Sequence, residues 1–370
     1  MASRDRRATL ANVAASAGVS VATVSKVLNG RNDVAPATRA LVQELLHEHD
    51  YLARRVRPAR SPTIELFFHG QLNAYHTEVL QGVVEAGAEA GVAVVVSVRP
   101  RGQRSPGAKR PAAWARELAT AGRQAAIVVT CEVGAADLTA LSRARMPVVV
   151  VDPLNLPSAR VTSVGSTNFA GGLAATQHLL DLGHRQIAYL GGPAATTCNQ
   201  ARMHGFRGAM EAAGAPVPDG YVRTGRFSYE HGIAGGAALL GLPEPPTAVF
   251  AGCDETALGV IEAARGRGLR VPEDLSVVGF DDTPIARLAA PPLTTVRQPL
   301  REMGAVAVRS ALRLAAGEGV DSHHVELATE LVVRQSTARP RGSAEAPAAT
   351  GETGQRHEST QLGRGPISRF

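Results

Sequence analysis

The sequence has little of what membrane-bound, disulfide-stabilised or zinc-binding proteins require. Its three cysteines, Cys131, Cys198 and Cys253, lie far apart and show no paired spacing. This spacing indicates neither a zinc site nor a disulfide framework, and it fits a reduced, cytoplasmic chain. No run approaches the roughly 20 apolar residues that a membrane-spanning helix needs, so we expect no contact with a membrane.

Signals for export and for catalysis are also sparse. Arg6 and Arg7 precede small residues as in an export signal, but polar residues interrupt the apolar core of about 7 to 15 residues that such a signal needs. The pair His323 and His324 has no metal-ligand partners at a recognised spacing, and no phosphate-binding glycine loop follows the first expected strand. We therefore expect neither a cofactor nor an enzyme activity.

Positive charge is concentrated near the amino terminus. Residues 1–60 carry ten lysines and arginines against five acidic residues, whereas residues 61–336 carry 24 against 25. A small basic module in front of a near-neutral body predicts an anionic partner for the front part. Nucleic acid is the usual partner of this kind.

The first fifty residues show the pattern of three short helices. Apolar residues recur at helical spacing over residues 10–17, Gly18 ends this helix, and Ser20 can cap the next one. Two helices that meet across such a tight turn form a helix-turn-helix motif. A third amphipathic helix is expected over residues 36–50.

The second helix turns small side chains outward, where an ordinary surface helix carries glutamate and lysine. Small side chains let a helix approach base edges closely, and methyl, hydroxyl and ammonium groups all find partners in a major groove. The alternative that this pattern leaves open is a small helical bundle whose second helix carries small side chains without a role in DNA binding. The outward residues are Val21, Ala22, Thr23, Ser25 and Lys26.

A basic linker and then an α/β body follow the three helices. We expect Arg55, Arg57 and Arg60 in this linker to lie along phosphates or in a groove. Strictly alternating strands and helices over the next roughly 275 residues predict two parallel sheets with helices on both faces. Strands are expected at residues 64–68, 92–98, 125–130, 148–152, 187–192, 247–252 and 275–282.

Acidic residues follow two of the expected strands. Ligands of open α/β sheets bind outside the carboxyl ends of the strands. Asp152, Asp281 and Asp282 stand at such ends, where carboxylates accept strong, directional hydrogen bonds from hydroxyl groups. Asp282 has a second interpretation as the cap of the next helix.

Several long segments resemble one protein family. TLANVAASAGVSVATVSKVLNGRNDVAPATRALVQELLHEHDY is similar to the DNA-binding headpiece of the LacI/GalR family of bacterial transcription regulators, across all three helices. ARMHGFRGAMEAAG and PTAVFAGCDETALGVIEAARGRGLRVPEDLSVVGFDD resemble that family's effector domain, which has the two-lobed fold of periplasmic sugar-binding proteins. The likeness is greatest to actinobacterial regulators of oligosaccharide use.

This resemblance implies a homodimeric repressor that binds double-stranded operator DNA under the control of a small carbohydrate. It places Val21, Ala22 and Lys26 at base-reading positions. The residues implied at positions that contact phosphate or adjoining bases are Thr9, Ser20, Ser25 and Asn29.

The resemblance also implies a set of effector contacts between the lobes. Taken alone, Tyr75 and Phe227 have the alternative of being core aromatics, and His76 of capping a helix or packing. The implied contacts are Tyr75, His76, Asp152, Cys198, Arg202, Phe227 and Asp281, with Asn73 and Gln298 nearby.

The chain departs from the family pattern at two places. Cys253 stands where the family usually has Asn, and a thiol is a poor hydrogen-bond partner, so the effector contact there should be weaker or apolar. Arg60 stands where the family has a leucine that wedges into the minor groove, and Pro58 disfavours a continuing helix. We therefore expect this hinge to enter the groove electrostatically and to kink DNA less.

The chain divides into four parts by these criteria: a headpiece (residues 1–53), a basic hinge (54–62), an effector and dimerisation domain (63–336) and a disordered tail (337–370). The tail is too poor in apolar residues to fold and lacks the leucine heptads of a tetramer. By resemblance, the chain crosses between the lobes near Val164, near residues 295–298 and around His323.

Two other functions are alternatives to a regulator. An exported sugar receptor would explain the body but would leave the headpiece without a purpose. A sugar-metabolising enzyme would need a general acid and a nucleophile, and the sequence offers no such pair.

Overall fold

The computed structural model describes residues 10–28, 31, 33–48, 62–99, 110–155 and 161–341. The expectations for the hinge and for five of the DNA contacts fall outside these ranges and stay predictions. These five residues are Thr9, Asn29, Arg55, Arg57 and Arg60.

The amino-terminal module consists of three short helices around a small apolar core. Val13, Val24, Val27, Val42 and Leu46 are buried in this core. The first two helices meet at a bend of 105°, which confirms the helix-turn-helix motif. The helices are α1 (Leu10–Ala17), α2 (Val21–Leu28) and α3 (Pro36–Glu48).

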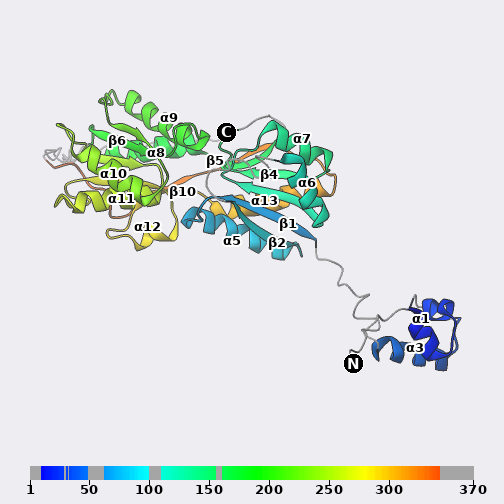
Figure 1. The fold of residues 1–370 in the computed structure, drawn as a ribbon. Coiled ribbons are helices and arrows are strands. Elements are labelled where there is room, and N and C mark those ends of the chain that lie inside the picture. The colour runs from blue at the N-terminus through cyan, green and yellow to red at the C-terminus, as the bar shows by residue number, and fades with distance from the viewer. Residues whose placement is uncertain are drawn as a thin grey trace, which may run out of the picture.

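Lobe 1 is built on a six-stranded sheet in the order β11-β5-β4-β3-β1-β2, with all neighbouring strands parallel. Helices cover both faces of this sheet (Figure 1). Its strands are β1 (Thr63–His69), β2 (Ala93–Arg99), β3 (Arg123–Val129), β4 (Val148–Val151), β5 (Thr162–Ser166) and β11 (His324–Leu327). Its helices are α5 (Ala74–Glu89), α6 (Pro111–Thr120), α7 (Ala135–Arg143) and α13 (Leu300–Ala315).

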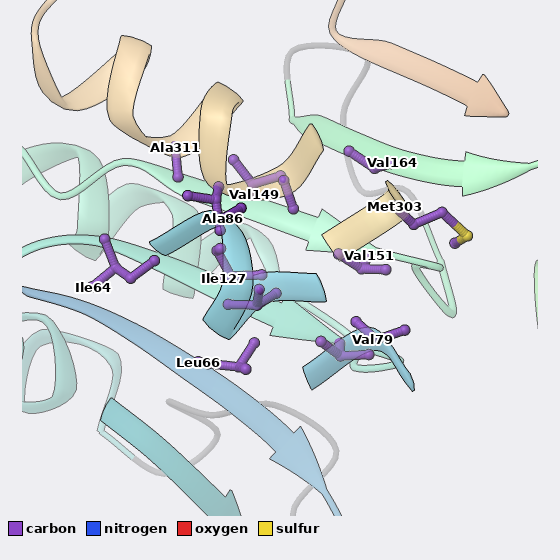
Figure 2. Packing of buried hydrophobic residues seen from close by; sticks show 14 of the residues in the cluster. Ile64, Leu66, Val79, Ala86, Ile127, Val149, Val151, Val164, Met303 and Ala311 are labelled. Atoms are coloured by element: carbon purple, nitrogen blue, oxygen red, sulfur yellow. The ribbon is translucent and has the colours of Figure 1, made fainter. Parts of the chain in front are cut away.

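The core of lobe 1 follows from the period of two along each strand. Ile64 and Leu66 of β1 belong to one apolar cluster with Val79 of α5 and Met303 of α13 (Figure 2). Phe67 lies next to Leu66 in sequence and points to the other face, where its ring contacts the edge of Trp114 of α6.

Lobe 2 has the sheet order β12-β10-β9-β8-β6-β7. All neighbouring strands are parallel, as predicted, except that the last strand, β12, runs antiparallel to β10. Its strands are β6 (Ile187–Gly191), β7 (Val222–Thr224), β8 (Ala248–Ala251), β9 (Ser276–Asp281), β10 (Thr294–Arg297) and β12 (Glu330–Val332). Its helices are α8 (Asn168–Asp181), α9 (Thr197–Ala212), α10 (Tyr229–Leu240), α11 (Asp254–Arg265) and α12 (Pro284–Leu288).

The chain passes between the lobes three times. It crosses from β5 to α8, from β10 to α13, and from β11 to β12. The first two crossings lie close to the expected positions. The third lies at residues 328–329 and not around His323, because His324 still begins β11 in lobe 1.

Residues 337–341 belong to lobe 2 and not to the tail. The amide of Ala338 donates to Ser276 Oγ, and Thr337 Oγ1 lies 2.9 Å from His178 Nε2. Arg341 forms an ion pair with Asp274. The expected tail boundary at residue 337 is therefore wrong, since polar side chains fix this segment despite its low apolar content.

Among the described residues, no single helix is long and apolar enough to cross a membrane. Within that part of the chain, only α1 and α2 taken together, as a bent pair, meet the criteria of length and composition.

Candidate functional site

The outward face of α2 matches the sequence expectation. Val21 is 46% exposed, and Ala22 and Lys26 are exposed beside it. Ser20 begins the helix, and its hydroxyl accepts from the amide of Thr23 at 3.1 Å. Small polar groups thus surround an open helical face, as the major-groove interpretation requires.

Lys26 is the charged group of this face. Its Nζ lies 2.7 Å from Asp33 Oδ2, with the two side chains 50% and 55% exposed. Exposed pairs of this kind contribute little stability, about 0–1 kcal/mol, so the ammonium can exchange Asp33 for a base or a phosphate at small cost. The assignment of individual DNA contacts on α2 stays a prediction.

A cleft of about 680 Å³ lies between the two lobes. Residues at the carboxyl ends of strands and the amino ends of helices from both lobes line it, as expected for open α/β sheets. Of the nine residues implied at or near the effector, eight line this cleft: Asn73, Tyr75, His76, Asp152, Cys198, Arg202, Phe227 and Asp281.

Tyr75 and Asp152 form the polar wall of lobe 1. Tyr75 lies in the first turn of α5, and its Oη donates to Asp152 Oδ2 at 2.6 Å. Burial raises the pKa of Asp152, while the hydrogen bond from Tyr75 opposes this rise. Asp152 has a φ of 45°, a left-handed conformation that costs free energy and that turns its carboxylate at the end of β4.

Arg202 of α9 is the buried cation of the cleft and is only 3% exposed. Its Nε donates to Asn168 Oδ1 at 2.7 Å, and its Nη1 donates to the carbonyl of Gly252 at 2.6 Å. The guanidinium lies 3.8 Å from the centroid of the Phe280 ring and 5.5 Å from that of Phe227. Two hydrogen bonds and two rings therefore fix this side chain before any ligand arrives.

Asp281 faces Arg202 from the end of β9. Its Oδ1 lies 3.8 Å from Arg202 Nη1 and accepts from Gln298 Nε2 at 2.6 Å. Burial raises the pKa of Asp281 well above its ordinary value, and Arg202 opposes that rise. With a φ of 118°, Asp281 also occupies a strained backbone conformation at the site.

Gln298 acts behind the cleft and does not line it. Ser166 Oγ donates to Gln298 Oε1 at 2.6 Å, and the amide nitrogen of Gln298 donates to Asp281. Ser166 ends β5 and Gln298 follows β10, so this chain of hydrogen bonds joins two crossings to a cleft carboxylate. The resemblance places Gln298 near the effector contacts, and in the structure its side chain holds the carboxylate of Asp281.

Asn73 and His76 have a structural role in addition to lining the cleft. Asn73 Oδ1 accepts from the amide of His76, and His76 Nδ1 accepts from the amide of Asn73, so the two form a capping box on α5. Because Nδ1 accepts, the neutral ring carries its proton on Nε2, which donates to Thr130 Oγ1 at 3.1 Å. Burial lowers the pKa of His76 to about 4, with a further contribution from His69.

This lowered pKa predicts a dependence of stability on pH. The folded state binds the proton of His76 less tightly than the unfolded state does, so stability is lost as pH falls from about 6.5 to about 4. The loss should amount to about 2–3 kcal/mol for this residue. Urea unfolding at pH 7 and pH 4.5 should show a smaller loss for His76→Gln, which keeps an acceptor for Asn73. Equal losses in the two proteins would contradict the assignment.

Cys253 caps α11 and lines the cleft beside Phe227. Its Sγ accepts from the amide of Thr256 at 3.4 Å and lies 3.2 Å from Thr256 Oγ1. Burial raises the pKa of the thiol. The side chain therefore uses its weak hydrogen-bonding capacity on α11, which supports the expected apolar contact at this position.

Asp282 is neither a ligand group nor a helix cap. Its carboxylate pairs with Arg297 at 2.7 Å and with Arg334 at 2.6 Å, while Thr283 occupies the N-cap position of α12. The interpretation of Asp282 as a cap is therefore wrong. These pairs join β9 to the end of β12, so Asp282 stabilises lobe 2.

Several cleft residues were not predicted from the sequence. In the sequence, only its position directly after β3 indicates that Thr130 lies at the cleft. Glu132 and Glu255 stand in no sequence pattern that predicts a place in the cleft. Asp254 begins α11, and its carboxylate accepts from the amide of Thr283 at 2.8 Å and from Thr295 Oγ1 at 2.5 Å.

Comparison with known proteins identifies two regions. Residues 9–53 match a family model described as "Bacterial regulatory proteins, lacI family", and residues 176–337 match a "Periplasmic binding protein-like domain". The chain is 33% identical over 336 residues to the transcriptional regulator DegA of Bacillus subtilis, which covers 90% of this chain and 98% of DegA. It is 34% identical over 348 residues to the regulator CelR of Thermobifida fusca, which covers 90% of this chain and 99% of CelR.

Solved structures show the same likeness. A complex of the regulator CelR with cellobiose matches with a TM-score of 0.67 and 33% identity, over 89% of this chain and all of that one. A lac repressor dimer bound to operator and to the anti-inducer ONPF matches with a TM-score of 0.70 and 27% identity, over 90% and 100%. With its helix-turn-helix headpiece and its two α/β lobes, the chain belongs to the LacI family of bacterial transcription regulators.

Proposed function

We propose that this DNA-binding regulator is controlled by a small carbohydrate that binds in the cleft between lobes 1 and 2. The observation that carries the proposal is the arrangement around Arg202. A fixed guanidinium, the carboxylates of Asp152 and Asp281, and the ring of Phe227 converge on one cavity. Polar edges beside an aromatic face are what a sugar ring requires, since its hydroxyls need partners and its C–H face needs apolar cover.

The cleft can hold such a ligand by specific atoms. Asp152 Oδ2 already accepts from Tyr75, and Asp281 Oδ1 already accepts from Gln298. We propose that these two carboxylates accept from ligand hydroxyls and that the guanidinium of Arg202 donates to one. Because their other partners already fix these side chains, ligand binding costs little additional side-chain conformational entropy.

The lobes also contact each other directly, and a ligand in the cleft can favour or disfavour these contacts. Thr197 Oγ1 of lobe 2 donates to the carbonyl of Pro153 in lobe 1 at 2.6 Å. The amide of Ala74 in lobe 1 approaches Glu255 Oε1 of lobe 2 at 3.4 Å. A ligand shifts affinity for DNA only through its preference for one arrangement of the lobes over another.

The names of similar proteins agree with this proposal. CelR forms a complex with cellobiose, and a chain 32% identical to this one is the ribose operon repressor of Escherichia coli. The lac repressor is a dimer that binds an operator. We extend these properties to this chain as a cytoplasmic homodimeric repressor of a near-palindromic operator, without a cofactor and without an enzyme activity.

The DNA-binding half of the proposal is tested by Lys26→Ala. Duplexes selected from a random library by the wild-type chain should bind the variant at least tenfold more weakly, because a base or phosphate contact of α2 is lost. Fluorescence anisotropy measures this affinity. Arg116→Ala, which removes an exposed positive charge from lobe 1, is the control and should bind as the wild type does. Selection of no preferred sequence by the wild type would contradict the assignment.

A further inference from the structure

The charges that line the cleft bear on the kind of sugar it accepts. The described lining residues include six carboxylic acids and two arginines. Arg226 is exposed, and Arg202 is the buried cation. The acids are Glu132, Asp152, Glu230, Asp254, Glu255 and Asp281. An anion brought into this cleft would therefore meet more acidic than basic side chains.

The helix amino termini at the cleft are already supplied with acceptors. Such termini are ordinary phosphate sites, because their amides point outward and the helix dipole favours an anion. At α5, the amide of Ala74 faces Glu255 Oε1 at 3.4 Å, and the amide of His76 donates to Asn73. At α9, the amide of Thr197 donates to the carbonyl of Leu154 at 3.3 Å.

The other two helix starts show the same arrangement. At α10, Ser228 Oγ accepts from the amide of His231, and Glu230 lies in the first turn. At α11, Cys253 accepts from the amide of Thr256, and Asp254 and Glu255 occupy the first turn. A phosphate at either helix would compete with a protein acceptor and would sit beside a carboxylate.

Arg202 does not offset this excess of negative charge. Its Nε and Nη1 are used by Asn168 and Gly252, and its ring contacts hold the guanidinium plane in place. The remaining hydrogens lie on Nη1 and Nη2, and Nη1 also lies 3.8 Å from Asp281 Oδ1. The charge of Arg202 is therefore already shared with a carboxylate of the cleft and does not stand free for a phosphate.

We propose that the cleft accepts an uncharged sugar and rejects the phosphorylated form of the same sugar. This inference rests on the proposed sugar effector and specifies its chemical class. A phosphate ester adds a charge of about −1.5 to −2. Against six carboxylic acids this should weaken binding by at least about 100-fold, since a like-charge contact costs several kcal/mol.

An effector of this class is supplied and consumed by definite classes of reaction. An unphosphorylated sugar is the product of glycosidic bond hydrolysis or of transport without phosphorylation. It is consumed by a kinase that transfers a phosphoryl group to one of its hydroxyls. The regulator would thus sense the sugar before the kinase step.

Thermal melting of the full chain tests the inference with matched pairs. Ribose, glucose, trehalose and cellobiose are each compared with their own terminal phosphate ester, at equal ionic strength. The expected result is a rise in the melting temperature with at least one neutral sugar and none with its ester. A phosphate ester that binds as tightly as its neutral partner, or more tightly, would overturn the inference.

A second arm does not depend on the identity of the sugar. Inorganic pyrophosphate, compared with sodium chloride of equal ionic strength, should leave the melting temperature of the wild type unchanged. A rise in the wild type that is absent in Arg202→Ala would overturn the inference by showing an anion site in the cleft. A failure of every neutral sugar, with pyrophosphate also inert, would contradict the sugar effector while upholding the rejection of anions.

Discussion

Replacing Arg202 with alanine should abolish stabilisation by the effector and should also lower the stability of the free protein. The guanidinium lies between Asp281 and the rings of Phe280 and Phe227, and it donates to Asn168 and Gly252. Removing one partner of a buried charge pair typically costs about 3–5 kcal/mol, because the other charge stays buried without compensation. The rise in Asp281 pKa on loss of Arg202 should reduce this cost through protonation of the carboxyl group.

The experiment compares melting temperatures with and without a neutral sugar. At a concentration about 100 times its Kd, a ligand that binds only the folded state stabilises it by about 2.7 kcal/mol, and this increment should vanish in Arg202→Ala. The control is Arg207→Ala, an exposed position on the same helix. Retained binding of DNA by Arg202→Ala shows that the headpiece is folded. A full ligand-induced shift in Arg202→Ala would refute the role given to this side chain.

Gly172→Ala should be strongly destabilising, although the substitution adds one methyl group to a helix. Gly172 of α8 packs against α9 so closely that a Cβ atom would lie 2.3 Å from the backbone oxygen of Arg202. Backbone cannot swing aside as the end of a flexible side chain can, so α8 and α9 must separate. Overpacking of this kind typically costs about 1–3 kcal/mol, and a clash with backbone belongs at the upper end.

The same substitution should weaken effector binding, because α9 carries both Arg202 and Cys198 into the cleft. Gly208→Ala on α9 is the matched control, since a Cβ atom there would meet its nearest neighbour, Phe169 Cζ, at an ordinary contact distance of 3.9 Å. Gly208→Ala should raise the stability of α9 by up to about 1 kcal/mol, because alanine has a higher helix propensity than glycine. Urea midpoints of the two variants measure the contrast, and similar midpoints would contradict the close packing of α8 on α9.

The elements with a strong apolar period could be predicted from sequence. The three headpiece helices and the buried strands β1, β3, β4, β6, β8 and β9 lie within a few residues of their expected positions. Strands such as β11 and β12 were not predicted, because they are only four and three residues long and contain no buried residue. Their places are set by pairing with β5 and β10, which lie far away in the sequence.

Some residues of the candidate site could likewise be predicted from sequence, and others could not. Asp152 and Asp281 could be identified because each follows an apolar strand, and open α/β sheets place ligands there. The hydrogen bond from Gln298 to Asp281 could not be predicted, because it depends on the packing of β10 against β9. Glu255 could not be foreseen, since its approach to Ala74 joins residues 181 positions apart in different lobes.

The central claim is that a ligand in the cleft controls binding of DNA by the headpiece. Its most direct test is the affinity of the wild-type chain for a selected duplex, measured by anisotropy with and without a saturating neutral sugar identified by thermal shift. The account predicts a change in Kd of about 5- to 150-fold, the usual range of allosteric coupling, and no change in Arg202→Ala. An unchanged Kd in the wild type, at a sugar concentration that raises its melting temperature, would contradict the account.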